Sequence, residues 1–470
     1  MSAAGAALAV LLLAAAAQYA WNAFAVAPLA GYDATAHAGY FVSIVREGRV
    51  PHPLEGWQTF HPPLYYLVAS VVWRTLEPLG AVPLIVGLRA IGALPWLGAG
   101  WVASRLARRL GATPEAAGVA AALFWLVPCN QLAAVMVGNE AASAALATFA
   151  LPFVLTLQED PRDLRAALGA GLLAGLAFAT KYSGLWIAAA CAVPFLRGGL
   201  DGRALRALAV CLVAGVVVAG PVYVRNLALT GSPFPMTREQ EPLKSAEAIL
   251  TPRPRQLTDY VRLDPDSVLR PSIFHRPGRP GHYASRNPAM ANVWGLAYAG
   301  AWYDPFGQRV PIESHRDGVW WGTALLLLGL VPTALMLAGF ARATANTVRS
   351  RGRSREAPLV LMMWLALASF VAFTWRVPTW AAVKASYFLP VAAPAVIFFA
   401  QSVGQLGAVL RRAALAVSLL AALGAGLVFT ERVVFTLDPT ATLVPAWRYY
   451  AAQLPEGYLD EALRTFYGEP

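Results

Sequence analysis

Long apolar runs separated by short gaps rich in arginine make up most of the chain. A helix that crosses a bilayer needs about 20 mainly apolar residues. Runs of this kind predict roughly eleven spans, at 4–26, 85–104, 115–136, 141–157, 167–180, 183–197, 205–222, 318–341, 358–375, 385–406 and 413–430. The pattern therefore predicts an all-α polytopic membrane protein in which residues 1–430 form one transmembrane unit.

The segment 62–80 is apolar enough to span but is interrupted by Arg74, Glu77 and Pro78. Its paired prolines suit a helix start, where backbone N–H groups have no helical partner. We interpret it as a juxtamembrane helix, because its short apolar stripe suits an interfacial position. The alternative is a twelfth span with the N-terminus outside, which would move Asp33 into the cytoplasm. The first span also resembles a signal peptide, but it lacks a basic start, so we interpret it as an uncleaved anchor.

The composition supports this class and assigns a side to each gap. Of the 470 residues, 57% are hydrophobic and 13% are charged, which excludes an ordinary soluble protein. The net charge of +11 comes mainly from arginine, and arginine between spans marks the cytoplasmic face, not a nucleic-acid site. On the predicted map the arginine clusters share one side, at 105–109, 162–165, 197–206, 342–355 and 411–412.

Three polar segments fall on the opposite side of this map. They are a first loop at 27–84, a large loop at 223–316 and a C-terminal tail at 431–470. The large loop is rich in proline and arginine, which predicts irregular structure against the membrane face. The tail is too short for a core of its own.

The first loop holds most of the candidate chemistry. It reads GYDATAHAGYFVSIVREGRVPHPLEGWQTFHPPLYY from 31 to 66. Asp33 lies just beyond the first span, at a depth where water, a lipid headgroup and a side-chain base can meet. A plainer interpretation is that Asp33 caps a helix or a turn, which is a common role of Asp.

Short motifs in a fixed order carry a family resemblance. They are Tyr-Asp-x-x-x-His (32–37), Pro-Pro-Leu-Tyr-Tyr (62–66), Arg-Arg-Leu-Gly (108–111), Asn-Glu-Ala (139–141), Thr-Lys-Tyr-Ser-Gly (180–184), Pro-Val-Tyr-Val-Arg-Asn (221–226) and Lys-x-x-Tyr-Phe-Leu-Pro (384–390). Together, over about residues 1 to 405, they resemble the GT-C superfamily of membrane glycosyltransferases. The branch is similar to the protein O-mannosyltransferases and aminoarabinose transferases (glycosyltransferase 39-like) of bacterial membranes.

The resemblance implies a GT-C fold and a multi-pass protein of the bacterial inner (plasma) membrane. It also implies transfer of a sugar, hexosyl or pentosyl, from a polyprenyl-phosphate donor to a lipid, glycan or protein acceptor on the extracytoplasmic face. The chain departs from the family where Ala34 replaces a common Glu and where His61 replaces a Lys that often precedes the prolines.

The residues suit this chemistry because glycosyl transfer needs a base for the incoming hydroxyl or amine and cations for the leaving phosphate. Asp33 is the expected base, and Glu140 is the second acidic position, unless it only complements a helix dipole. Arg225, Lys384 and Lys181 are the expected phosphate ligands, although cations at span ends also occur as interfacial anchors.

Four further residues complete the expected substrate-binding set: His37, His61, Tyr65 and Tyr387. His37 follows Asp33 by four residues, so on a helix the two would share a face; each His could equally be a solvated loop residue. No cofactor is expected, and a divalent metal has no support from ligand spacing. The three cysteines also lack metal or disulfide spacing.

Other functions fit parts of the pattern. A transporter or flippase of lipid-linked sugars would need many spans too, but it predicts related repeats with broken helices at the midplane, and no repeat is evident. A non-catalytic GT-C-like assembly partner and a polymerase or ligase of lipid-linked glycans remain alternatives.

Overall fold

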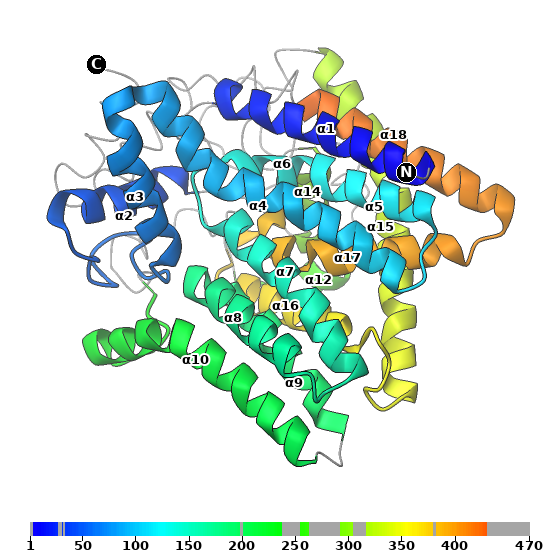
Figure 1. The fold of residues 1–470 in the computed structure, drawn as a ribbon. Helices are drawn as coiled ribbons and strands as arrows, with labels where there is room; N and C mark the ends of the chain where they lie inside the picture. The colour runs from blue at the N-terminus through cyan, green and yellow to red at the C-terminus, as the bar shows by residue number, and fades with distance from the viewer. Residues whose placement is uncertain are drawn as a thin grey trace.

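The computed structural model describes most of the chain as a bundle of helices (Figure 1). The described residues are 3–26, 31, 33–197, 201–236, 254–262, 292–303, 316–378 and 382–429. Every regular element in these ranges is helical, which confirms the all-α prediction. Much of the predicted large loop and the whole C-terminal tail lie outside the described residues.

The helices follow the predicted apolar runs closely. The first ten are α1 (Ala3–Ala25), α2 (Ala34–Glu47), α3 (Leu64–Leu76), α4 (Ala81–Arg109), α5 (Pro114–Leu126), α6 (Pro128–Val135), α7 (Glu140–Glu159), α8 (Leu164–Thr180), α9 (Leu185–Ala192) and α10 (Gly202–Thr230). The others are α12 (Thr258–Val261), α14 (Val293–Trp302), α15 (Arg316–Arg349), α16 (Ala357–Arg376), α17 (Ala392–Gly404) and α18 (Ala408–Val428). Short 3-10 segments are η1 (Glu77–Leu79), η2 (Tyr182–Gly184), η3 (Val193–Arg197) and η7 (Ala385–Val391).

Eight helices in the described part of the chain are long and apolar enough to cross a membrane, or nine if the bent pair α5 and α6 is one span. The chain is therefore a multi-pass membrane protein. The predicted count of eleven is not confirmed, because the apolar runs at 167–180 and 183–197 form shorter helices, below the length that a bilayer requires.

The segment 62–80 forms a helix of 13 residues, α3, followed by η1. That length is too short to span, as the juxtamembrane interpretation predicts. α3 packs against α2 and the start of α4 in a separate apolar cluster, which includes Phe41, Trp73 and Leu88. Figure 1 shows α2 and α3 together, in blue, at one end of the bundle.

The span at 115–136 is broken where Pro128 begins α6, and the two halves meet at 56°. A break inside a span leaves carbonyl groups without helical donors, and lipid cannot satisfy them. Three side chains donate to these carbonyls instead: Asn130 Nδ2 to Phe124 O at 2.9 Å, Tyr19 Oη to Trp125 O at 2.6 Å and Gln131 Nε2 to Leu126 O at 2.6 Å.

The same network fastens the end of α1. The Gln131 Oε1 atom accepts hydrogen bonds from Gln18 Nε2 at 2.7 Å and from Asn22 Nδ2 at 3.2 Å. Arg89, 1% exposed on α4, donates to Ala23 O at 2.7 Å. These bonds fix the C-terminal end of α1 within the bundle.

Candidate active site

Asp33 occupies the N-cap position of α2 with φ 54° and ψ 23°, in the left-handed region. Asp tolerates this region better than most residues, yet it remains uncommon and occurs often at functional sites. The side chain makes no capping hydrogen bond. Its Oδ2 atom instead accepts from Lys384 Nζ at 2.8 Å. The capping interpretation of Asp33 is therefore not supported.

Lys384 stands at the N-cap of η7, 351 residues further along the chain. The side chains of Lys384 and Asp33 are 20% and 21% exposed. The pair is thus partly enclosed but still open to a ligand.

A second carboxylate and ammonium pair lies deeper. Glu140 is the first residue of α7, and its Oε1 atom accepts from Lys181 Nζ at 2.6 Å. The side chains are 8% and 14% exposed. Glu140 also stands where the α7 dipole favours a negative charge, so its dipole role and a role in the site coexist.

His37 contacts one residue of each pair, since its backbone N–H donates to Asp33 O at 3.0 Å and its ring lies beside Glu140. A hydrogen bond of 2.7 Å joins its Nδ1 atom to the Tyr66 hydroxyl, and its Nε2 atom lies 3.8 Å from Glu140 Oε2. The His61 ring stacks beside it, with ring centroids 6.0 Å apart. His37 is 1% exposed, so it is not a solvated loop residue.

The charges of this cluster balance. Burial raises the pKa of Asp33, but the Lys384 ammonium and weaker effects of His37 and Lys181 outweigh it, so the pKa lies below its ordinary value. Burial lowers the pKa of His37, and it lowers that of His61 strongly with help from Lys181. Both imidazoles are therefore neutral at neutral pH, and each carboxylate of the site is paired with a lysine.

The remaining predicted residues lie around this cluster. Tyr65 is buried in α3 with its ring edge-on to Tyr66. Tyr387 lies in η7, three residues after Lys384, with its ring against Phe373. Arg225 lies in α10 and makes its hydrogen bonds outside this cluster. Its Nη2 atom donates to two carbonyls of the first loop, Val50 O at 3.1 Å and Pro51 O at 2.6 Å.

Two residues of the site were not predicted. Tyr66 holds the His37 ring, although only its neighbour in the Pro-Pro-Leu-Tyr-Tyr motif was selected. Gly138 precedes the Asn-Glu-Ala motif, and a Cβ atom there would come within 2.8 Å of Glu140 Oε2. The doubled tyrosine and the glycine beside a buried acid were the signals available in the sequence.

No protein-family model matches the chain, and neither does any curated protein. Solved structures do share its fold. The apo form of ArnT from Cupriavidus metallidurans has a TM-score of 0.56 and 15% identity, covering 97% of this chain and 82% of that one. The Archaeoglobus fulgidus oligosaccharyltransferase AglB, in complex with an inhibitory peptide and a dolichol-phosphate, has a TM-score of 0.53 and 16% identity, covering 98% of this chain.

This chain spans about 60% of the length of AglB. A structure of the same archaeal enzyme with Zn and sulfate has a TM-score of 0.51 and 18% identity, covering 98% of this chain and 57% of that one. In the described part of this chain, no three His, Cys, Asp or Glu residues form a group that could hold a metal. The fold that this chain shares with ArnT and AglB confirms the predicted GT-C fold.

Proposed function

We propose that this chain, which has the GT-C fold, is a glycosyltransferase of the bacterial inner membrane that acts at the extracytoplasmic face. It transfers one hexosyl or pentosyl unit from a polyprenyl-phosphate donor to a lipid, glycan or protein acceptor. On this proposal the first loop at 27–84, the large loop at 223–316 and the tail at 431–470 are extracytoplasmic.

The observation that carries the proposal is the pairing of Asp33 with Lys384. A partly enclosed carboxylate beside an ammonium group offers both groups that the reaction needs, a base and a phosphate ligand. ArnT and AglB, with which the chain shares its fold, are glycosyltransferases, which supports the same reaction class here.

In the proposed reaction the Asp33 carboxylate takes the proton of the acceptor hydroxyl or amine. The acceptor atom forms a bond to the anomeric carbon as the bond from that carbon to the phosphate oxygen breaks, through an oxocarbenium-like transition state. Lys384 turns from Asp33 to the phosphate, so the leaving polyprenyl phosphate gains a cation while the base loses its partner.

The second pair and Arg225 have supporting roles in this proposal. Glu140 positions the acceptor, and Lys181, its partner, is a further candidate ligand of the phosphate. The His37 ring lies beside Glu140 and is fixed by its bond to the Tyr66 hydroxyl. Arg225 keeps the first loop in place through the Val50 and Pro51 carbonyls, and its remaining N–H groups are candidate donors to the phosphate.

The proposal is tested by incubating purified protein with a panel of polyprenyl-phosphate sugars and candidate acceptors. We expect release of polyprenyl phosphate with at least one sugar, together with a product that carries a single added unit. Transport of the intact lipid across proteoliposomes without release would favour a flippase. Addition of a whole chain would favour a polymerase or ligase.

Replacing Lys384 with Met should change the pH dependence of transfer. In the wild type the pKa of Asp33 is lowered, so activity persists as the pH falls and is lost only when the pH passes this lowered pKa. Without the ammonium group, burial, which is the largest influence, raises the pKa against only the weaker effects of His37 and Lys181. The acid limb of kcat/KM against pH should therefore move to higher pH, and an unchanged acid limb would remove Asp33 as the titrating base.

A further inference from the structure

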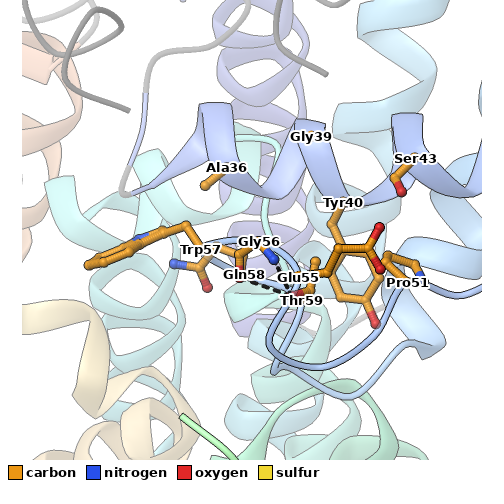
Figure 2. Close-up of a pocket in the computed structure, with 10 residues that line it drawn as sticks. All are labelled: Ala36, Gly39, Tyr40, Ser43, Pro51, Glu55, Gly56, Trp57, Gln58 and Thr59. Carbon is orange, nitrogen blue, oxygen red and sulfur yellow. Dashed lines mark hydrogen bonds between the residues drawn. The ribbon is translucent and has the colours of Figure 1, made fainter. Parts of the chain in front are cut away.

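A half-open pocket lies between α2 and the segment 51–59 that follows it, beside the candidate active site (Figure 2). One wall is a stripe on α2, and the other wall is formed by loop residues 51–59. The α2 stripe consists of Ala36, Gly39, Tyr40 and Ser43. Small side chains at two of these positions leave the space, and Figure 2 shows the Tyr40 ring pointing across it toward the loop.

The loop that forms the second wall is held by its own hydrogen bonds. Thr59 Oγ1 donates toward Pro53 O at 3.1 Å and accepts from Gly56 N at 2.9 Å. The Glu55 carboxylate accepts from Arg49 at 2.9 and 3.0 Å and from His52 N at 2.7 Å. Together with the Arg225 bonds, these contacts form the wall before any ligand arrives, which lowers the entropy cost of binding.

Gln58 lines the pocket, and its side-chain oxygen is buried without a partner. Gln58 is 5% exposed, and no hydrogen-bond donor among the described residues reaches its Oε1 atom. A buried acceptor without a donor costs stability, and such atoms in native proteins call for an explanation. The missing partner must be a donor, that is, a hydroxyl, an amine or a water.

The size of the pocket restricts what can enter. Its enclosed volume is about 20 Å³, which is room for one water-sized group. The space widens to about 280 Å³ when the open mouth is included, and Tyr40 and Trp57 are among the lining residues. One hydroxyl can therefore enter the enclosed part while the ring that carries it stays in the open part.

The pocket adjoins the reactive residues through Tyr40. The ring of Tyr40 lines the pocket and stacks on Tyr66 with centroids 3.8 Å apart. Tyr66 in turn bonds His37. From Asp33 to Tyr40 the chain advances by seven residues, or about 10 Å at the helical rise of about 1.5 Å per residue.

We propose that this pocket is a saccharide subsite, in which Gln58 Oε1 accepts a hydrogen bond from a hydroxyl or amine of a sugar ring. The ring belongs either to the donor sugar or to a glycan acceptor. The assignment rests on the proposed glycosyl transfer, but the binding step itself needs no transfer and can be measured alone.

The test uses saturation-transfer NMR of purified protein with methyl glycosides of a hexose, a pentose and an amino sugar. We expect saturation of at least one glycoside by the wild type and by Asp33→Asn. Gln58→Met, which keeps the side-chain length and removes the acceptor, should lose it, and so should Ala36→Leu, which fills the pocket. Gln58→Glu restores an acceptor oxygen and should restore binding.

The unfolding temperature distinguishes a binding role of Gln58 from a structural role. Because Gln58→Met removes a buried acceptor that has no donor, the unfolding temperature should stay the same or rise. A lower unfolding temperature would show that the amide has a structural partner and would overturn the proposal. Equal saturation in wild type and Gln58→Met, or none in the wild type, would overturn it as well.

Transfer kinetics then identify the source of the ring. With a working donor and acceptor, Gln58→Met should raise KM by about 3-fold to 10-fold for one of them, the effect of one lost hydrogen bond, and leave kcat nearly unchanged. A rise for the donor places the donor sugar in the pocket, and a rise for the acceptor places a glycan there. If wild-type protein binds glycosides but transfers no sugar, the result would count against the proposed function and not against the subsite.

Discussion

Asp33→Asn should reduce sugar transfer by about 10²-fold to 10⁴-fold, the usual contribution of a positioned general base. The amide keeps the size of the side chain and can still accept a hydrogen bond from Lys384, but it cannot take the acceptor proton. Folding should be preserved, because the pair is about a fifth exposed and water can solvate the lysine. The measurement is single-turnover transfer by protein that shows wild-type elution and unfolding temperature.

Asp201→Asn is the matched control. Asp201 is the N-cap of α10, and its carboxylate does accept from Ala204 N at 2.9 Å, a role that Asn fills about equally well. Transfer should therefore be unaffected in Asp201→Asn. Wild-type transfer by well-folded Asp33→Asn would remove the catalytic assignment and leave Glu140 as the next candidate base.

Lys181→Met should destabilise the protein by about 3–5 kcal/mol, because it leaves the buried Glu140 carboxylate without its cation. The Glu140 side chain is only 8% exposed, so water replaces the lost partner poorly. Thermal unfolding in detergent measures the effect directly. Part of the deficit should disappear at low pH, where protonation removes the unpaired charge.

Glu140→Gln combined with Lys181→Met is the decisive comparison. Removing both charges leaves a neutral amide beside an apolar chain, and replacing a whole buried pair is often close to neutral. The double variant should recover most of the lost stability while transfer stays impaired. If the double variant is as unstable as Lys181→Met alone, the loss comes from packing and not from an uncompensated charge.

The apolar pattern was sufficient to predict where the helices lie, because every run long enough to span needs a helix to satisfy its backbone. The apolar pattern was less informative about whether each run forms one continuous helix. The run at 115–136 was read as one span, although Pro128 interrupts it, since hydropathy does not register a break that side chains can repair. The short runs at 167–180 and 183–197 likewise meet the apolar criterion but not the length.

The candidate site was predictable in its residue types but not in its pairings. Lys384 and Asp33 were selected separately, as a phosphate ligand and a base, and nothing local indicates that residues 351 positions apart share a hydrogen bond. The partners of Arg225 could not be predicted either. A cation at a span end suggests an anion site, yet its guanidinium donates to the backbone carbonyls of Val50 and Pro51, which no side-chain pattern records.

The amide network at the broken span also implies a delay during synthesis of the chain. Gln18 is made 113 residues before Gln131, the residue that its amide bonds. At a synthesis rate of about 5–20 residues per second, the gap lasts about 6 to 23 s. During that interval the first helix has a polar face that lipid cannot satisfy. The helix must therefore wait beside the insertion machinery, or bury that face elsewhere, until its partner emerges from the ribosome.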